Sequence, residues 1–255
     1  MIRRPLPVTV RLVKPYVLVI GHAAAAGEAP ANTLAGVRQC LDCRAEAMEI
    51  DVQLCADGVP VLMHDDTVDR TTNLSGPVRE RTLAELQAAD AGDGEPVPTL
   101  DQVLDLVAGR LTVMCELKAT PGHPEIDQAN VDAVVGVIRR RGAEAWTAIQ
   151  SFSADMVQRA RATEPRISAA IITGPVSGEE VDRLLGGLMK RHGQAISVEH
   201  HAVNRGLVEK AKRRQVSVWT WTADDPADWA RVVEAGVDGI ITNVPHRLRA
   251  WLEAL

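Results

Sequence analysis

The sequence predicts an α/β protein of the (β/α)8 barrel class, and three observations support this prediction. Strand-like apolar runs alternate with helical patterns along the whole chain, and eight such units can be counted. This regular alternation is typical of a parallel sheet whose strands are joined by helices. A length of 255 residues fits one closed barrel of this kind, which takes about 250 residues. No Ser/Gly linker or low-complexity tract interrupts the pattern, so we predict a single domain over residues 1–255.

Eight short apolar runs are predicted as the parallel strands of the barrel. They are residues 17–22, 47–54, 111–118, 146–152, 167–173, 195–199, 216–222 and 239–243. Helical patterns fill the segments between them, at residues 33–43, 100–107, 130–141, 154–162, 179–192, 205–214 and 226–235, with 246–255 closing the chain. Five polar residues stand where N-caps are expected: Asn32, Thr99, Ser153, Ser177 and Asn204. Gly142, Gly193 and Gly236 follow helices, where a left-handed residue is favoured.

The segment from residue 55 to 98 departs from this regular alternation. Ala56-Asp57-Gly58 is a turn signal between two strand-like runs, so residues 59–64 are predicted to fold back on residues 47–54 as a hairpin. A polar stretch rich in Thr, Asp and Gly follows. We interpret the whole segment as a short hairpin and insertion after the second strand, which crosses one end of the barrel.

Composition excludes several classes of protein. The net charge of −6 and the lack of a basic face argue against nucleic-acid binding. No run of 18 apolar residues is present, so no membrane span is predicted. The first 30 residues superficially resemble a leader peptide, but their longest apolar run, residues 17–20, is too short for one, and we expect a cytoplasmic protein. The four cysteines, at positions 40, 43, 55 and 115, form neither a disulfide framework nor a zinc motif.

Three acidic side chains are predicted to point into the barrel. Residues two apart on a strand face the same side, so Glu49 and Asp51 share one face while Met48, Ile50 and Val52 face the helices. Glu116 and Lys118 repeat this arrangement on another strand, with Cys115 facing the helices. Buried carboxylates need a positive partner, and carboxylate oxygens are the ligands that Mg²⁺ and Ca²⁺ prefer. The alternative is a salt-bridge network around Lys118, which would leave two carboxylates without a cation.

Two histidines are expected near the same rim, because His22 ends the first strand and His64 ends the hairpin. Histidine is the usual proton donor or acceptor near neutral pH, and barrel enzymes work at the carboxyl ends of their strands. His200 and His201 follow the sixth strand and are weaker candidates for a substrate contact. Trp219 and Trp221 share one face of the seventh strand; at least one should reach the mouth, and Trp219 is our predicted substrate contact.

Several motifs resemble those of the glycerophosphodiester phosphodiesterase family. The main signature lies in residues 48–54 (MEIDVQL), 57–61 (DGVPV) and 64–73 (HDDTVDRTTN). Further blocks follow in the family's order at residues 116–118 (ELK), 150–152 (QSF), 219–220 (WT) and 236–243 (GVDGIITN). The resemblance covers essentially the whole chain, and the ordered set of motifs is highly specific.

This resemblance implies a phospholipase C-like barrel that hydrolyses a small-molecule phosphodiester. It implies that Glu49, Asp51 and Glu116 hold one divalent cation, Mg²⁺ or Ca²⁺ with Mn²⁺ possible. His22 and His64 would be the acid/base pair, and Lys118 would contact the phosphate. The products would be an alcohol and glycerol 3-phosphate.

The first motif departs from the family pattern at two positions. Family members usually read H-R-G-A and then P-E-N-T, whereas this chain has residues 22–27 (HAAAAG) and 30–33 (PANT). Ala23 therefore replaces the arginine and Ala31 the glutamate. Losing both is coherent if the two charges were paired, because losing one would strand the other. Three carboxylates, one divalent cation and Lys118 then sum to zero, so the substrate monoanion meets a neutral site.

Two other classes of function stay open, and the alanine pair favours the first of them. One is a catalytically impaired or re-specialised protein that keeps the cation and binds a different phosphate ester. The other is a metal-dependent barrel lyase or aldolase, for which two histidines would be an unusual choice.

Restoring the two charges tests whether the alanines are a paired loss. We expect the double variant Ala23→Arg/Ala31→Glu to exceed either single variant in kcat/KM on glycerophosphoglycerol by about 1–2 kcal/mol, the range of a charge-assisted hydrogen bond. Ala23→Arg alone leaves its guanidinium free to compete for the carboxylates. Measuring kcat/KM for all four proteins decides the matter. A double variant no better than the parent means that the alanines are not a simple deletion of a charge pair.

Overall fold

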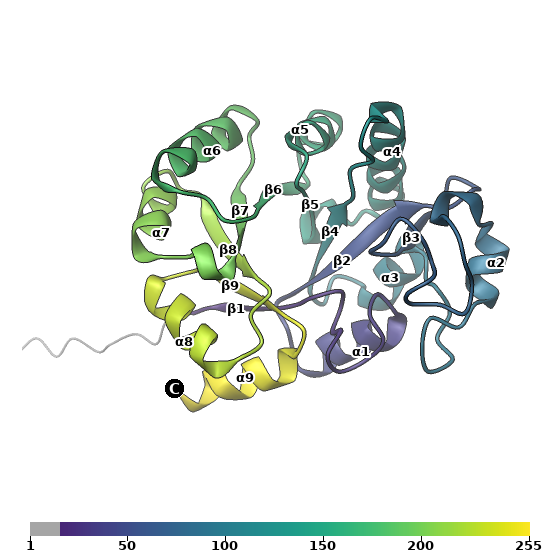
Figure 1. Ribbon diagram of the computed structural model, residues 1–255, viewed down its shortest axis with the longest axis horizontal. Coiled ribbons are helices and arrows are strands. Elements are labelled where there is room, and N and C mark those ends of the chain that lie inside the picture. Colours follow the sequence, from purple (N-terminus) through teal and green to yellow (C-terminus); the bar gives the residue numbers. More distant parts are fainter. Residues whose placement is uncertain (1–15) are drawn as a thin grey trace, which may run out of the picture.

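A computed structural model describes residues 16–255, and these residues form a closed barrel of eight parallel strands with helices on the outside (Figure 1). The strand order is β1-β9-β8-β7-β6-β5-β4-β2, and pairing of β1 with β2 closes the ring. This confirms the predicted (β/α)8 class. Residues 1–15, the first half of the leader-like segment, lie outside the described residues.

Each of the eight predicted barrel strands is present, with its ends within one residue of the predicted ones. They are β1 (Leu18–Gly21), β2 (Ala47–Leu54), β4 (Thr112–Leu117), β5 (Thr147–Ser151), β6 (Ser168–Thr173), β7 (Ala195–Glu199), β8 (Ser217–Trp221) and β9 (Gly239–Thr242). Apolar runs bounded by turns and helix caps are therefore sufficient to locate the strands of this barrel.

The predicted helices are also present. They are α1 (Leu34–Asp42), α3 (Leu100–Val107), α4 (Pro124–Arg141), α5 (Ala154–Thr163), α6 (Gly178–Lys190), α7 (Arg205–Lys212), α8 (Pro226–Ala235) and α9 (Pro245–Ala254), joined by the short 3₁₀ segments η2 (Glu144–Trp146) and η3 (His200–Ala202). Only α4 differs clearly, since it begins six residues before the predicted start at residue 130. Its first turn carries a proline at the start and acidic Glu125 and Asp127, which favour a helix N-terminus but give no apolar periodicity.

Four of the five predicted N-caps are correct, and Asn32 is the exception. The side chains of Thr99, Ser153 and Asn204 accept a hydrogen bond from the first turn of their helices, and Ser177 forms a capping box with Glu180. The cap of α1 is instead Thr33, whose hydroxyl accepts from the Gly36 N–H. Asn32 has a positive φ of 58° and turns its side chain toward the barrel.

The left-handed C-terminal positions are correct at Gly142 and Gly236, with φ values of 60° and 93°. Gly193 was wrongly predicted, because His192 takes the left-handed conformation after α6. A side chain at Gly193 would meet Leu188, since its Cβ would lie 2.1 Å from Cδ1. The glycine therefore serves a close approach to α6.

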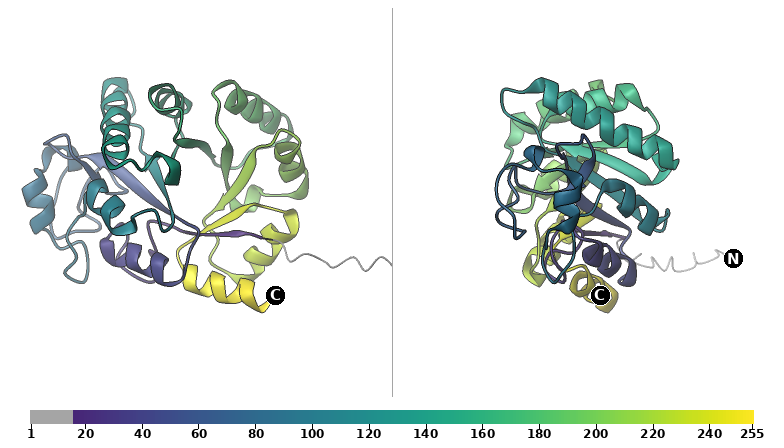
Figure 2. Two further views of the ribbon diagram at one scale, coloured as in Figure 1. Left: turned by 180° about the vertical axis from the view of Figure 1, so that it is seen from behind. Right: turned by 90° about the vertical axis from the view of Figure 1, so that its right-hand side faces the viewer.

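Two apolar layers support the rim where the site lies. The larger layer, between strands and helices, includes Met48, Ile50, Val52 and Cys115, as the alternation predicted. A smaller layer fills the inside of the barrel, where Ile20, Ala47, Met114, Ala148 and Ile241 are buried and Leu18 and Trp219 pack against them. The helices surround the strands in both views of Figure 2.

Residues 55–98 form the predicted hairpin and insertion. The short strand β3 (Pro60–Leu62) runs antiparallel to β2, and η1 (Val78–Glu80) and α2 (Leu83–Ala88) follow. The insertion has a small apolar core of its own, which includes Val68, Leu86 and Val97. It protrudes beside α1 and α3 (Figure 1), and Glu95 fixes it to α1 by accepting hydrogen bonds from Ala35 N–H and Arg38.

Among the described residues, no helix has the length and apolar character needed to cross a membrane.

Candidate active site

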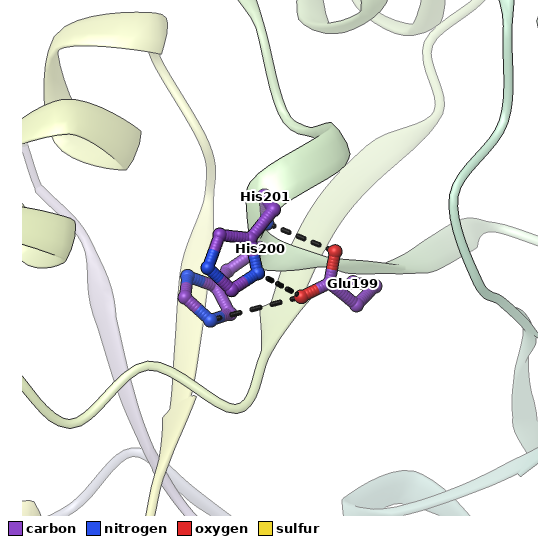
Figure 3. Close-up of side chains that lie close together, drawn as sticks. All are labelled: Glu199, His200 and His201. Atoms are coloured by element: carbon purple, nitrogen blue, oxygen red, sulfur yellow. Dashed lines mark hydrogen bonds and ion pairs between the residues drawn. The ribbon is translucent and has the colours of Figure 1, made fainter.

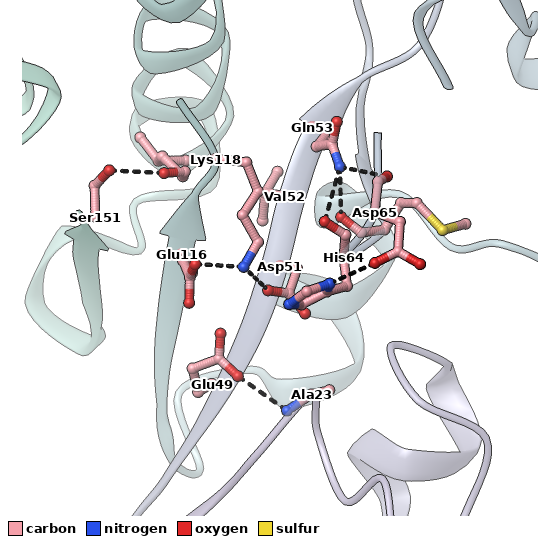
Figure 4. A network of polar contacts seen from close by, with 12 residues as sticks. Ala23, Glu49, Asp51, Val52, Gln53, His64, Asp65, Glu116, Lys118 and Ser151 are labelled. Carbon is pink, nitrogen blue, oxygen red and sulfur yellow. Dashed lines mark hydrogen bonds and ion pairs between the residues drawn. The ribbon is translucent and has the colours of Figure 1, made fainter. Parts of the chain in front are cut away.

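The three predicted carboxylates come together at the carboxyl ends of β2 and β4. Register places Asp51 directly opposite Glu116, with Glu49 one step lower on the same face of β2. One carboxylate oxygen of each residue lies within 4.8 Å of the other two. Glu49 and Asp51 are almost completely buried, and Glu116 is 9% exposed. Figure 4 shows the three side chains pointing into one space.

Lys118 lies between two of these carboxylates. Its ammonium group is 2.7 Å from Asp51 Oδ1 and also donates to Glu116 Oε1 (Figure 4). Burial alone would lower the pKa of Lys118, but attraction by Asp51 and Glu116 outweighs it and raises the pKa to about 12. The lysine is therefore charged at neutral pH. It pairs with two carboxylates, and not one as the salt-bridge alternative assumed, so Glu49 alone is without a cationic partner.

Glu49 carries the strongest sign of an unmet interaction. Its Oε2 accepts a 2.9 Å hydrogen bond from the Ala23 N–H, but its buried Oε1 has no hydrogen-bond partner among the described residues. Burial, with repulsion from Asp51 and Glu116, raises the pKa of Glu49 well above its usual range. Burial also raises the pKa of Glu116, although Lys118 opposes that rise. A buried carboxylate oxygen without a partner is costly.

The geometry and charge of this group fit one divalent cation. Two oxygens bound to one ion at about 2.4 Å can be no more than about 4.8 Å apart, and one oxygen from each of the three carboxylates satisfies this limit. With Lys118 the cluster sums to a charge of −2, which one divalent ion neutralises. The oxygen-only donor set is typical of Mg²⁺ and Ca²⁺. The described residues that could hold a cation are therefore those predicted: Glu49, Asp51 and Glu116.

The loop after β1 carries His22 and is bound to the same carboxylates. Gly21 permits its tight turn, since a Cβ there would lie 1.9 Å from the Ala24 carbonyl oxygen. Ala23 and Ala24 adopt positive φ values of 42° and 67°. The Asn32 side chain donates to Asp51 Oδ2 at 2.7 Å and accepts from the Asp51 N–H at 3.0 Å.

A chain of hydrogen bonds fixes the orientation of the His22 ring. Asp224 accepts from the Asn243 side-chain amide at 2.7 Å, from its backbone N–H at 2.8 Å and from the Thr242 hydroxyl. A carboxylate can only accept, so the Asn243 amide must turn its Oδ1 away from Asp224 and toward His22. His22 Nδ1, 2.7 Å from that oxygen, must then carry a proton. In neutral His22 the other nitrogen, Nε2, is left as a proton acceptor.

His64 is held differently, on the loop after β3. Gln53 Nε2 donates to the carbonyl oxygens of Met63, His64 and Asp65 at 3.1, 3.2 and 2.7 Å and so fixes the loop (Figure 4). The ring Nδ1 lies 2.7 Å from Asp65 Oδ1. Arg70 contacts the other oxygen of Asp65 at 2.6 Å and is the main cause of the lowered Asp65 pKa, about 2. His64 therefore meets a charged carboxylate where His22 meets a neutral amide.

The wall opposite the carboxylates is aromatic. Trp221 and Phe152 line a cavity together with both histidines, Glu49, Glu116 and Lys118. Their rings are edge to face with centroids 5.8 Å apart, and Trp221 Nε1 donates to the Ser197 carbonyl oxygen. Trp221 therefore reaches the mouth of the barrel. Trp219, our predicted substrate contact, lies two residues earlier on β8 and is not among the residues that line this cavity. Both tryptophans pack against the apolar layer inside the barrel.

His200 and His201 belong to a second group at the end of β7, with Glu199 (Figure 3). His201 Nδ1 lies 2.6 Å from Glu199 Oε1, and His200 Nε2 is 3.7 Å from the same oxygen. Arg231 places a guanidinium nitrogen 3.1 Å from His200 Nδ1 and pairs with Asp228. His200 thus lies between Glu199 and the Arg231–Asp228 ion pair, so we interpret these residues as a structural salt-bridge network. Neither histidine lines the cavity above the carboxylates.

Sequence reasoning missed several residues that position the site. Asn32 was interpreted as a helix cap, and Asn243 and Asp224 were assigned no role. Each of the three lies in a loop that follows the carboxyl end of a barrel strand, and the active sites of barrel enzymes are built from these loops. That placement is the signal that could have identified Asn243.

Three carboxylates, a lysine and two histidines at the carboxyl ends of barrel strands place this protein among barrels built like enzymes, with a site suited to a divalent cation and to proton transfer. Comparison with known proteins identifies the family within this class. Residues 22–247 match the Glycerophosphoryl diester phosphodiesterase family, and the chain belongs to that family. Enzymes of the family are phosphoric diester hydrolases.

Relatives cover nearly the whole chain. The YhdW protein of Bacillus subtilis is 34% identical over 235 residues, covering 89% of this chain and 94% of its own. A glycerophosphodiester phosphodiesterase of Caldanaerobacter subterraneus is 31% identical over 247 residues, covering 91% and 96%. An Oleispira antarctica phosphodiesterase, solved in complex with its product sn-glycerol-3-phosphate, is 25% identical with a TM-score of 0.83, covering 94% of this chain and 97% of its own.

Removing the charge of Glu49 should stabilise the cation-free protein. A carboxyl whose pKa is raised on folding costs stability once the pH exceeds its unfolded value, and the cost grows until the pH passes the folded pKa. We expect Glu49→Gln in EDTA at pH 7 to increase the free energy of unfolding by about 1–2 kcal/mol, as for relief of an unsatisfied buried group.

Chemical denaturation with and without Mg²⁺ measures two effects of Glu49→Gln: the change in stability without the cation, and the change in the stability gained from the cation. The parent should gain stability with Mg²⁺, and Glu49→Gln should gain less because one cation ligand is lost. Glu234→Gln, an exposed residue on α8, is the matched control. A Glu49→Gln variant that is less stable than the parent in EDTA contradicts the assignment of unmet charge.

Releasing the His22 ring should impair turnover and not binding. Asp224→Ala removes the acceptor that orients Asn243, so the amide is free to flip and His22 can lose its Nδ1 proton. We expect kcat to decrease by about 10- to 100-fold with little change in KM. Nitrogen NMR of the His22 ring should show a mixture of tautomers. The neighbouring exposed Asp225, whose side chain makes no cap hydrogen bond, provides the control Asp225→Ala; equal losses in both variants would exclude the orienting role.

Proposed function

We propose that the protein hydrolyses glycerophosphodiesters to an alcohol and glycerol 3-phosphate by histidine acid/base catalysis beside a cation held by carboxylates. One observation supports this most directly. His22 and His64 both line the cavity that contains Glu49, Glu116 and Lys118. A diester phosphate bound there would lie between two groups able to transfer protons.

The cation would be held by Glu49, Asp51 and Glu116. When bound, it supplies Lewis-acid polarisation of a phosphate oxygen and offsets the negative charge of the site. Mg²⁺ and Ca²⁺ fit the oxygen donors, and Mn²⁺ also accepts them. Lys118, already charged, adds a donor for a second phosphate oxygen.

The surroundings of the two histidines suggest separate roles. His22 presents an unprotonated Nε2 because Asn243 holds the proton on Nδ1, so His22 suits the acceptor of the proton from the nucleophile, either water or the substrate's own 2-hydroxyl. Attack by the 2-hydroxyl would release the alcohol and form a cyclic phosphate, which water would then open to glycerol 3-phosphate. His64 has the Asp65 carboxylate beside its ring, which accommodates the protonated imidazolium. His64 therefore suits the donor that protonates the leaving alkoxide.

Trp221 and Phe152 would bind the glycerol part of the substrate along their apolar faces. A product complex of the Oleispira relative contains sn-glycerol-3-phosphate, which supports a small phosphorylated alcohol as the ligand of this site. We propose one catalytic domain for the whole chain, and its cytoplasmic location remains a prediction.

A second candidate function is binding of a different phosphate ester with little or no turnover. Ala23 and Ala31 favour it, because both line open space beside His22 where charged side chains are usual in the family. Release of alcohol from a diester separates this candidate from the enzyme, and it also excludes a lyase or aldolase.

Activity should depend on the cation and on both histidines. In a screen of glycerophosphodiesters with Mg²⁺, Ca²⁺ and Mn²⁺, we expect alcohol release that excess EDTA abolishes. His22→Ala and His64→Ala should each decrease kcat by roughly 10²–10⁴-fold, with the double variant losing much less than the product of the two.

Two results would contradict this mechanism. Full activity after dialysis into EDTA would exclude the cation, and small, strictly multiplicative losses would assign the histidines to separate structural roles.

A further inference from the structure

Two cavities meet at His22 and His64. One, of about 80 Å³, lies above Glu49, Glu116 and Lys118 and is bounded by the aromatic wall. The other, of about 250 Å³, lies between the loop after β1 and the insertion. We call the second space the flank cavity. It is lined by Ala23, Ala26, Ala31, Asn32, Asp51, Leu62, Met63, Arg70, Thr71, Ala91 and Asn243 as well as the two histidines.

The flank cavity exists because its walls carry small side chains. Four alanines line it, three from the loop after β1 and Ala91 from the insertion. The walls themselves are fixed: the Ala91 N–H bonds to the Glu95 carbonyl oxygen, and Glu95 is tied to α1. Pro30 and Gly92 are in contact, since a Cβ on Gly92 would lie 2.9 Å from Pro30 Cβ. The space is therefore held open by a rigid frame.

A phosphodiester carries two substituents, each derived from an alcohol, and the two cavities differ in the size of the substituent that they can accept. The smaller cavity contains Lys118 and the carboxylates that would hold the cation, so it suits the phosphate and the shorter glycerol substituent. The larger one, close to the size range of small-molecule pockets, has room for a ring-sized group. Because both histidines border both cavities, a phosphate between them would direct its second alcohol into the flank cavity.

Arg70 defines the chemistry of this space. Its Nε contacts Asp65 at 2.6 Å, and among the described residues its two terminal nitrogens have no hydrogen-bond partner. The side chain is 62% exposed and lines the flank cavity. The single carboxylate in the lining, Asp51, is already bound by Lys118 and Asn32. A cationic alcohol would therefore meet a free guanidinium and no free anion, whereas hydroxyl groups would find donors at Arg70 and an acceptor at the Thr71 hydroxyl, which itself donates to Met63 Sδ.

We propose that the flank cavity binds the alcohol group of the diester and selects a ring-sized polyol, such as inositol, over a cationic alcohol such as choline. This proposal rests on the proposed function, because it assigns the second substituent of the same substrate. It makes Ala23, Ala26 and Ala31 specificity-determining positions.

Three substrates that share the glycerol phosphate group test the proposal: glycerophosphoinositol, glycerophosphocholine and glycerophosphomethanol. In Mg²⁺, we expect kcat/KM to be about tenfold higher for the inositol ester than for the choline ester, the effect of one hydrogen bond to a charged group. Ala31→Leu fills the cavity and should lower the inositol-to-methanol ratio of kcat/KM about tenfold. Ala26→Leu fills it from a second position and should do the same if Ala31→Leu does not fold.

Ala88→Leu, on the exposed side of α2, is the matched control and should leave the ratio unchanged. A choline ester turned over as well as the inositol ester, or a ratio insensitive to both filled variants, would overturn the proposal while leaving the phosphodiesterase function intact.

If no diester is turned over, the proposed function fails and the cavity is tested by binding. Calorimetric titration with glycerophosphoinositol and glycerophosphocholine in Mg²⁺ should then show tighter binding of the inositol ester, weakened in Ala31→Leu. Equal binding of the two esters would overturn the proposal.

Discussion

The buried charge of Glu49, Asp51 and Glu116 is the constraint on which the site depends. Adjacent strands in register bring the three carboxylates together, and Lys118 reduces their charge to −2. Both loops that carry histidines are bound to this group. The loop after β1 is held through the Ala23 N–H and Asn32, and the loop after β3 through the Met63 N–H, which donates to the Asp51 carbonyl oxygen. The residues suited to hold the cation thus also set the positions of the two histidines that we propose as the acid/base pair.

The two histidines differ in their hydrogen-bond partners, although both lie at the same rim of the barrel. Both stand at the rim and border the same cavity. His22 is bound by an amide whose direction Asp224 dictates, and this keeps its proton on the nitrogen that faces away from the substrate. His64 is bound by a carboxylate that Arg70 keeps ionised. These different partners support the separate acid and base roles that we propose for the two histidines.

Most of the fold and the central site could be predicted from the sequence, because strand alternation decides which side chains face the barrel. Alternation predicts which face of a strand a residue occupies, but not how far along the barrel axis it lies, so it could not distinguish Trp219 from Trp221. The register of β8 against β9 places Trp219 beside Gly239, at the start of β9 and away from the carboxyl ends of the strands. Asn243 lies 221 residues from His22 and Asn32 lies 19 from Asp51. Such contacts depend on how the barrel closes, which local pattern does not reveal.

The structure of the loop after β1 explains how alanine can stand at positions 23 and 31, where the family resemblance leads us to expect charged residues. Its contacts with the carboxylates use the backbone of Ala23, which donates to Glu49 and accepts from the Asn32 N–H, and the side chain of Asn32. None of them uses the side chain at position 23 or 31. Truncating those side chains therefore opens a cavity without moving the wall behind it. Because the wall is fixed by the cation site and not by the substrate pocket, the pocket can change its specificity while the reacting groups keep their geometry.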